Sequence, residues 1–453
     1  MHTRNRNHGT VLVLSLLFLV ILSTLTVAMA SFSGNCVQIA DNQRQGDVAY
    51  RAAESGLEVM RYWLSRFVMP KTTPPNQYLA TIVASLRSDL TAAGVSQIVV
   101  QDDGAIRTVA LDPSVGSSFS AHLRMDANDP TILHLAVTGS RAQSARTVEV
   151  AFHVVPYEHP IFSYGLATKG ALLFPQNPRL TGMTLPWEAD VYVDAPDMIG
   201  VDIGGNAQFD GNFYLRNPDG QMYCAGSLLI DGETGLDAQA HHVFAGADPV
   251  PFPPPDTQVF KSLATGPVVN PATMDLTKGL TLTNATIPAG TNPTFGATVT
   301  IQGVLVVESP NIVTFNRNCQ LNGVIIGDGT SENPAENQIN FAGNFATGAY
   351  PTGTAYTGLA ELAGTSILAP NFALSFTGNF SVINGVVAAG GLTFAGNASA
   401  EIRGSLLNYA TTPTVVNGNI SLSFDRAACT KIPGGFDTHR ALAYDAASYA
   451  MAF

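Results

Sequence analysis

Five aspartates lie close together in the sequence and are the first candidates for chemistry: Asp190, Asp194, Asp197, Asp202 and Asp210. If they lined adjacent turns of a repetitive fold, their carboxylates could bind calcium or transfer protons during polysaccharide cleavage. Aspartates that simply occupy solvated turns give the same pattern, and we favour that interpretation.

Two further groups could bind a metal ion. Asp328, Glu332 and Glu336 share one loop whose Asp-Gly start resembles a calcium loop, although the alternating ligands of an EF-hand are absent. His241 and His242 are adjacent, without a further acidic or histidine partner at ligand spacing. We therefore expect no metal and no cofactor, with Asp328 and Glu332 as weak metal candidates.

The sequence contains no GxSxG, no HExxH and no phosphate-binding glycine loop, so we expect a protein that is not an enzyme. The four cysteines are scattered without CxxC spacing, which argues against a zinc site: Cys36, Cys224, Cys319 and Cys429. In an exported protein Cys319 could pair with Cys429, but the sequence leaves the connectivity open.

Composition narrows the class of protein. A formal net charge of −12 argues against nucleic-acid binding through a basic surface. The length of 453 residues suggests two or three domains, and 42 glycines with 27 prolines favour a turn-rich β body.

Related phrases recur in the second half of the chain. They are residues 177–182 (NPRLTG), 206–211 (NAQFDG), 318–323 (NCQLNG), 379–385 (NFSVING) and 397–404 (NASAEIRG). The glycines that close the late phrases precede short apolar runs, and a period near twenty residues is typical of a solenoid. We predict a right-handed parallel β-helix over residues 161–430, with a β-sandwich as the alternative.

Two segments should depart from these coils. The proline-rich residues 248–255 cannot donate ladder hydrogen bonds at their prolines, so we expect a loop there that leads to a short helix near residues 258–264, outside the stack. Residues 431–453 form a C-terminal tail that either caps the solenoid or is flexible.

The middle segment, residues 71–160, reads as a small α+β unit. A helical pattern covers residues 78–93, and alternating runs predict strands at 97–101, 105–111, 118–125, 131–137 and 146–155. A β meander of this kind would pack against a helix and bury its apolar face.

The N-terminal region predicts a membrane segment that continues as a stalk. A polar leader, residues 1–9, carries Arg4 and Arg6, and an uncharged apolar run follows to about residue 30. Helical periodicity then draws an apolar stripe that includes Ala49, Ala53 and Met60, so we predict one long helix over residues 10–70. A signal peptide would be cut after Ala30, whereas a prepilin would be cut between Gly9 and Thr10.

Residues 9–14 (GTVLVL), the apolar run and residues 50–58 (YRAAESGLE) together resemble the N-terminal domain of PilX-type type IV pilus assembly proteins. The resemblance extends from the N-terminus to about Ser65 and implies processing at Gly9 and Thr10, with Leu14, Glu54 and Gly56 on the assembly helix. Major pilins carry glutamate where this chain has Leu14, which favours a minor or accessory component. The repeats also resemble the β-solenoid domains of bacterial envelope proteins.

We therefore expect a structural, pilus-associated protein of the bacterial cell envelope, anchored in the inner membrane or exported in a pilus, whose solenoid head serves assembly or adhesion. The resemblance implies prepilin peptidase and other pilin-like subunits or type II secretion machinery as partners. Two alternatives stay open: a β-helix that binds or cleaves surface polysaccharide, and a bactofilin-like scaffold that polymerises end to end.

Overall fold

The computed structural model describes residues 8–452, apart from residues 115, 330–332, 334, 396–398, 427–428 and 430–431. Arg4 and Arg6 of the predicted leader, Glu332 and Asn397 therefore lie outside the described residues. The chain divides into two compact units: unit 1 is Met1–Val155 with His439–Phe453, and unit 2 is Pro156–Thr438. Unit 2 is thus inserted in the chain between two segments of unit 1.

Unit 1 begins with the long helix α1 (His8–Leu64), which has 57 residues and extends about 85 Å at ~1.5 Å per residue. No proline interrupts this sequence, so the backbone ladder continues from the apolar run into the stalk. The predicted stripe is confirmed, because Ala49, Ala53 and Met60 are buried. The helix stops before the predicted boundary at residue 70, since Val68–Pro70 pair as strand β1.

The sheet of unit 1 has the order β1-β33-β5-β4-β3-β2. Its remaining strands are β2 (Ala105–Asp112), β3 (Ser117–Met125), β4 (Ile132–Arg141), β5 (Ser144–Pro156) and β33 (His439–Ala452). Helix α2 (Tyr78–Ala92) follows the short 3-10 helix η1 (Pro75–Gln77) and buries Ile82, Leu86 and Leu90.

The C-terminal strand β33 departs from the expected tail. Residues 439–452 neither cap the solenoid nor lie apart from the fold; they pair with β1 in the sheet of unit 1. Leu442 is buried in the core of this unit, and Tyr444 packs against it. A strand whose partner lies near the other end of the chain leaves no local signal, which is why the sequence did not reveal this pairing.

Unit 2 is a solenoid of three sheets, here called sheets I, II and III. Apart from the antiparallel strand β15, all of the strand pairings described in these sheets are parallel. The parallel β-solenoid is therefore confirmed, and the β-sandwich alternative is wrong. The right-handed sense of the coil stays a prediction.

Sheet I runs in the order β16-β12-β9-β6-β30-β27-β24-β21-β19-β17, with β23 also paired to β21. Its strands are β16 (Val243–Ala245), β12 (Phe213–Leu215), β9 (Val191–Val193), β6 (Leu166–Thr168), β30 (Leu406–Asn408), β27 (Val386–Ala389), β24 (Thr365–Ala369), β21 (Cys319–Asp328), β19 (Val299–Glu308), β17 (Leu280–Ile287) and β23 (Phe345–Thr347).

Sheets II and III form the other two faces. Sheet II contains, in spatial order, β13 (Gln221–Cys224), β10 (Ile199–Ile203), β7 (Leu172–Phe174), β31 (Thr414–Asn417), β28 (Leu392–Ala395), β25 (Ala373–Phe376), β22 (Asn337–Phe341), β20 (Asn311–Phe315) and β18 (Thr294–Phe295). Sheet III contains β15 (Glu233–Thr234), β14 (Leu228–Ile230), β11 (Ala207–Phe209), β8 (Arg179–Gly182), β32 (Ser421–Phe424), β29 (Ser399–Arg403) and β26 (Val382–Asn384).

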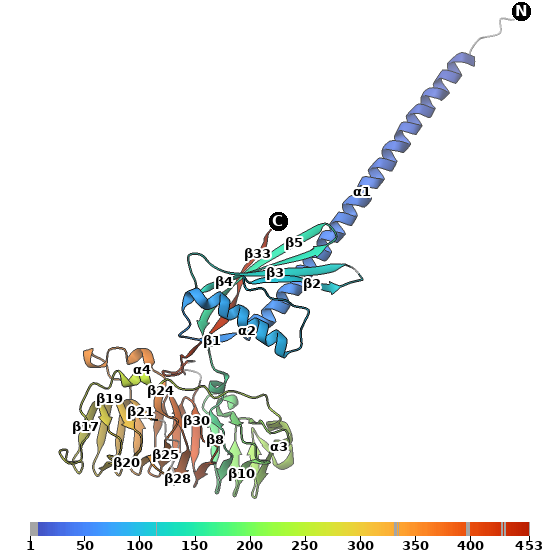
Figure 1. The fold of residues 1–453 in the computed structure, drawn as a ribbon. Coiled ribbons are helices and arrows are strands. Elements are labelled where there is room, and N and C mark those ends of the chain that lie inside the picture. The colour runs from blue at the N-terminus through green and yellow to red at the C-terminus, as the bar shows by residue number, and fades with distance from the viewer. Residues whose placement is uncertain are drawn as a thin grey trace, which may run out of the picture. The chain divides into compact units, whose positions relative to one another are not determined.

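The spatial order of the coils differs from their order in the chain. The chain begins at β6 to β8, winds to β16, and crosses back along residues 246–279 to β17, the other end of the stack. It then winds inward until β30 pairs with β6, with Leu406 opposite Leu166. Figure 1 shows this as yellow β17 at one end, red β30 in the middle and green β10 at the other end. The solenoid is a continuous stack with a permuted chain path.

Phenylalanine rings stack through the core of the solenoid. Phe295, Phe315 and Phe341 lie nearly parallel, with centroid separations of 5.0 and 5.3 Å, and Phe376 and Phe394 continue the column. These rings occupy equivalent positions of successive coils, because parallel pairing without a register shift places the same inward position directly above itself.

The segment that crosses back covers one face of the stack. Helix α4 (Gln258–Lys261) lies within the segment where a short helix was predicted, and its Phe260 is buried against the outer side of sheet I. Helix α3 (Gly235–His242) packs on β14, β15 and β16 at one end of the stack. At the other end Val269 is buried and Met274 packs against the core, so both terminal coils are covered.

Further 3-10 helices lie in the described connections of unit 2: η2 (Pro160–Ser163), η3 (Pro186–Ala189), η4 (Thr354–Tyr356) and η5 (Ala360–Leu362).

Candidate functional site

The first half of α1 presents an apolar surface on all sides. Every residue from Val11 to Ile39 is exposed, although most of these side chains are aliphatic or aromatic, and Leu14 is 59 % exposed. By length and composition, α1 is the one described helix that could cross a membrane. Cys36 lies exposed on α1, beyond the uncharged apolar run that ends near residue 30.

Gly9 and Thr10 fall in the first turns of α1, whose range begins at His8. Their predicted role in processing stays a prediction.

Glu54 contacts the C-terminal strand. Its carboxylate accepts a hydrogen bond from the Tyr449 hydroxyl, and the hydroxyl oxygens of Tyr449 and Tyr50 are 3.0 Å apart. Partial burial, followed by the neighbouring carboxylate, raises the pKa of Tyr449. The stalk helix is therefore connected at Glu54 to β33, the last strand of the chain. This contact stabilises the packing of β33 against α1. The predicted assembly role of Glu54 stays a prediction.

Gly56 lies where the helix comes closest to the sheet. A Cβ atom on Gly56 would be 2.6 Å from the Phe119 ring and 2.9 Å from a Val137 methyl group. Gly139 of β4 is the matching position on the sheet, because a Cβ there would be 2.0 Å from the Ala49 carbonyl oxygen. The small residues of the segment 50–58 (YRAAESGLE) thus allow α1 to pack closely on β3 and β4.

The five aspartates do not converge. Asp190 and Asp194 flank β9 of sheet I, Asp202 lies in β10 of sheet II, and Asp210 follows β11 of sheet III. Asp194 is paired with Arg216 at 2.7 Å. In the part of the chain that the structure describes, no three His, Cys, Asp or Glu residues form a group that could hold a metal ion.

The environment of Asp190 nevertheless differs from that of a solvated turn residue. Its Oδ1 accepts a hydrogen bond from the Asn212 backbone N–H at 2.8 Å. Burial raises the pKa of Asp190 to about 6, although the Asn212 hydrogen bond and the Arg426 charge oppose this shift. The sequence favoured the interpretation of all five aspartates as solvated turn residues, and this interpretation does not fit Asp190.

The other candidate ligands are engaged elsewhere. Asp328 forms an ion pair with Lys261 of α4, which holds the crossing segment against sheet I. Glu332 lies outside the described residues. His241 and His242 do have an acidic neighbour, contrary to expectation, because Glu233 lies 2.7 Å from Nδ1 of His241 and 3.7 Å from Nε2 of His242. Glu233 lies in β15, eight positions before His241, and the intervening helix α3 brings these groups together.

All four cysteines are free. Cys319 is buried in the solenoid core, where burial raises its pKa to a value well above neutrality, outside the range of a reactive thiolate. Cys429 donates a hydrogen bond to the Asp425 carbonyl oxygen at 3.2 Å. The Cys319–Cys429 pairing that the sequence left open is absent from the described residues.

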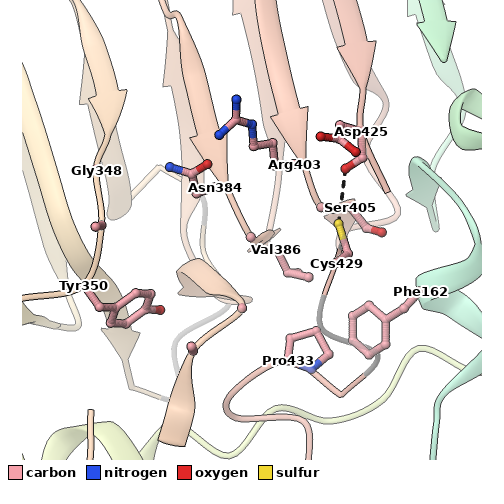
Figure 2. Close-up of a pocket in the computed structure, with 15 residues that line it drawn as sticks. Phe162, Gly348, Tyr350, Asn384, Val386, Arg403, Ser405, Asp425, Cys429 and Pro433 are labelled. Carbon is pink, nitrogen blue, oxygen red and sulfur yellow. Dashed lines mark hydrogen bonds between the residues drawn. The ribbon is translucent and has the colours of Figure 1, made fainter. Parts of the chain in front are cut away.

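A cavity of about 500 Å³ opens at the bend between sheets III and I (Figure 2). Gly364, Gly385 and Gly404 form one side of it, where a Cβ on Gly404 would be 2.4 Å from the Gly385 carbonyl oxygen. Gly385 and Gly404 are the glycines that close two of the repeated phrases. The repeat therefore requires glycine at this bend, and the missing side chains leave a hollow.

The walls of this cavity are amphipathic. Tyr350 and Phe162 lie on opposite sides, and Asn384 and Arg403 lie toward its rim (Figure 2). The Tyr350 hydroxyl is bonded to the Thr365 carbonyl oxygen, so the ring is fixed in place. The cavity carries no arrangement of nucleophile, base and oxyanion donors among its described residues.

No protein-family model matches the sequence, and no curated protein matches it. Among solved structures, the competence-associated pilin ComZ from Thermus thermophilus is similar over 90 % of this chain and 97 % of that chain, with 15 % identity and a TM-score of 0.27. A TM-score this low supports no conclusion about the function of this chain.

Proposed function

We propose that this chain is a membrane-anchored, non-enzymatic component of the bacterial cell envelope associated with a type IV pilus. In this role α1 anchors the protein and joins other pilin-like subunits, and the solenoid is a displayed head that serves assembly or adhesion. Prepilin peptidase would process the chain between Gly9 and Thr10.

The two halves of α1 are the observation that carries the proposal. The first half is apolar around its whole circumference and has no partner among the described residues, whereas the second half is buried on one stripe by its own sheet. A soluble helix rarely exposes so much apolar surface, so a lipid bilayer or neighbouring apolar helices are the environments that suit it.

Two of the alternatives, polysaccharide cleavage and end-to-end polymerisation, receive less support. Cleavage of polysaccharide by the five aspartates would need them on one face. Four of them flank or lie in strands of three different sheets, and Asp197 lies in the connection between β9 and β10. End-to-end polymerisation would need open terminal coils, and α3 at one end and residues 269–276 at the other cover them.

The mature N-terminus tests the processing step. The protein is purified from bacterial membranes that contain prepilin peptidase, and its N-terminal peptide is identified by mass spectrometry. A start at Thr10 supports the proposal, because the apolar helix is then retained. A start at Ser31 overturns it, because the membrane segment would have been removed as a signal peptide.

Cys36 allows the assembly step to be tested with the native sequence. It is the exposed cysteine on α1, beyond the apolar run. Cross-linking in intact cells with a short bis-maleimide should join this chain to other pilin-like subunits or to a second copy. A Cys36→Ser variant is the control, and an absence of cross-linked species in cells that assemble pili would count against assembly through α1.

A further inference from the structure

A second cavity, of about 420 Å³, lies in the middle of the stack, where the coil that comes first in the chain pairs with the coil that comes last. It is lined by residues that directly follow four consecutive strands of sheet I, namely β6, β30, β27 and β24. These residues are Lys169, Tyr409 with Ala410 to Thr412, Gly390, and Pro370 with Asn371. Carboxyl ends of parallel strands meet at one edge of a sheet, so segments from distant parts of the sequence form one site.

Lys169 supplies a positive charge that no acidic side chain of the described residues neutralises. Its Nζ atom lies 5.4 Å from the ring centroids of both Phe252 and Tyr409. Two cation–π contacts hold the ammonium group in position without removing its charge. In a protein with a net charge of −12, a fixed cation without a carboxylate partner is available to an anionic ligand.

The turn that carries Tyr409 is held in place by hydrogen bonds. Asn408, fully buried, donates from Nδ2 to Oγ1 of Thr414 at 2.8 Å and accepts at Oδ1 from the Ala410 backbone N–H at 3.0 Å. The Tyr409 hydroxyl donates to the Pro253 carbonyl oxygen at 2.7 Å. The turn that follows β30 is therefore fixed before any ligand binds, which lowers the entropic cost of binding.

Neutral polar groups complete the lining. Thr411 and Thr412 are exposed, and their hydroxyl groups make no hydrogen bond to the described part of the chain. The Asn371 side chain is bonded to the Gly329 carbonyl oxygen through its amide nitrogen, which leaves its amide oxygen as an acceptor. One cation surrounded by hydroxyl and amide groups matches a ligand with one carboxylate and several hydroxyl groups.

We propose that this cavity, hereafter the seam cavity, binds a uronate residue of an acidic polysaccharide. Lys169 would pair with the carboxylate, and Thr411, Thr412 and Asn371 would bond the sugar hydroxyls. The volume lies within the range of small-molecule sites. A nucleic acid is disfavoured, because it needs several cations along a backbone and the seam cavity offers one.

This inference deepens the adhesive part of the proposed function and rests on it for its biological meaning. Its test uses binding by the purified full-length protein, so a failure here leaves the anchoring and processing of α1 untouched. Conversely, a mature N-terminus at Ser31 would overturn the proposed function but would not affect a measured affinity for the sugar.

The test is isothermal titration of the full chain in detergent with trigalacturonate, with maltotriose as the neutral control. Trigalacturonate should bind and maltotriose should not. Lys169→Met keeps the apolar stem and should weaken trigalacturonate binding about tenfold or more, as expected for loss of a charged hydrogen bond. Thr412→Val should weaken it severalfold. Lys278→Met is the matched control, because Lys278 is exposed on the solenoid and lies outside the seam cavity. The affinity of this variant for trigalacturonate should equal that of the unaltered protein.

Several results would overturn the inference. They are an absence of trigalacturonate binding, equal affinity in Lys169→Met and the unaltered protein, or equal binding of acetate and trigalacturonate, which would indicate a general anion site. Displacement of trigalacturonate by a short DNA duplex at stoichiometric concentration would also overturn it. Thermal unfolding of Lys169→Met in a Trp63→Phe background, followed by Trp187 fluorescence, shows whether the variant is folded. Thr412→Val provides a second variant that keeps the contacts of Lys169.

Discussion

Gly56 of α1 and Phe119 of β3 approach so closely that no larger residue fits at position 56 without movement of the ring. A Cβ atom there would lie 2.6 Å from two carbons of the Phe119 side chain, which is itself buried. The glycine thus sets the distance between the stalk helix and its sheet.

We predict that Gly56→Ala destabilises unit 1. Alanine is the better helix former by about 1 kcal/mol, but overpacking a filled core costs ~1–3 kcal/mol, and the contact distance indicates that the clash prevails. The change can be measured as the urea midpoint of Trp63 fluorescence in a Trp187→Phe background, since the chain has two tryptophans. Gly34→Ala is the control, because nothing lies within 4 Å of that position, and it should not lower the midpoint. If the urea midpoint of Gly56→Ala equalled that of the parent protein, the sheet could move away from the helix at little cost in stability.

Removing the Tyr449 hydroxyl should loosen β33. Tyr449→Phe deletes the hydrogen bond to Glu54 and the contact with Tyr50, so we expect faster amide hydrogen exchange in the peptides that cover residues 442–452. A hydrogen bond to a charged group contributes about 1.5–3 kcal/mol, and solvent exposure reduces this value here. Tyr444→Phe is the control, since the described structure gives its hydroxyl no hydrogen bond. Identical exchange in both variants would contradict the prediction.

The phenylalanine column should be a main source of stability in the solenoid. Phe315→Ala removes a ring that stacks on both neighbours, Phe295 and Phe341, and should cost about 3–5 kcal/mol. Hydrogen exchange of β18, β20 and β22 measures this loss locally. Ile312→Ala changes the same strand at a residue that is 36 % exposed, and it should cost less than about 1 kcal/mol. If both variants exchanged alike, the column would not be the dominant contribution.

Asp190→Asn should stabilise unit 2 at neutral pH. The pKa of Asp190 is about 6 in the folded protein against 3.8 in a model compound, so the unfolded state releases this proton first as the pH rises. Folding therefore carries no penalty from this group below about pH 3.8, loses stability between about pH 4 and 6, and carries the full penalty above that range. The asparagine avoids the penalty and retains an acceptor for the Asn212 N–H.

We expect a gain of ~1–2 kcal/mol at pH 7, less than the whole shift implies because the carboxyl group keeps some contact with solvent. Urea unfolding in a Trp63→Phe background, followed by Trp187 fluorescence from pH 3.5 to 8, measures it. The two proteins should converge at the acid end of this range. A constant difference at every pH would mean that the effect does not arise from ionisation of Asp190.

Local patterns allowed most individual elements to be predicted. The helix expected at residues 78–93 is α2 (Tyr78–Ala92), and the alternating run at 118–125 lies within β3 (Ser117–Met125). The repeat glycines Gly303, Gly323 and Gly385 do adopt positive φ angles at the bends, as the turn chemistry predicts. These features depend on neighbours in sequence, so the sequence contains the information directly.

Long-range pairing was not predictable in the same way. Several coils carry similar phrases, so nothing in residues 397–404 specifies that the next coil in space begins at residue 166. The pairing of β33 with β1 and the proximity of Glu233 to His241 likewise depend on the completed fold. The seam cavity was missed for this reason, because Lys169 and Thr412 become neighbours only when the first and last coils pair.

The permuted path of the solenoid has a mechanical consequence. The two chain segments that join unit 2 to unit 1 leave the stack from its middle, one before β6 and one after β32. These strands belong to adjacent coils. Tension carried through these connections would load the central coils in parallel, and the terminal coils near α3 and β17 would bear none of it. A terminal strand of a solenoid is paired on one side and can peel away, whereas β6 and β32 are each paired on both sides, so pulling either one out breaks two ladders together. The seam cavity lies at these same central coils, so a bound ligand would be held where the load is borne.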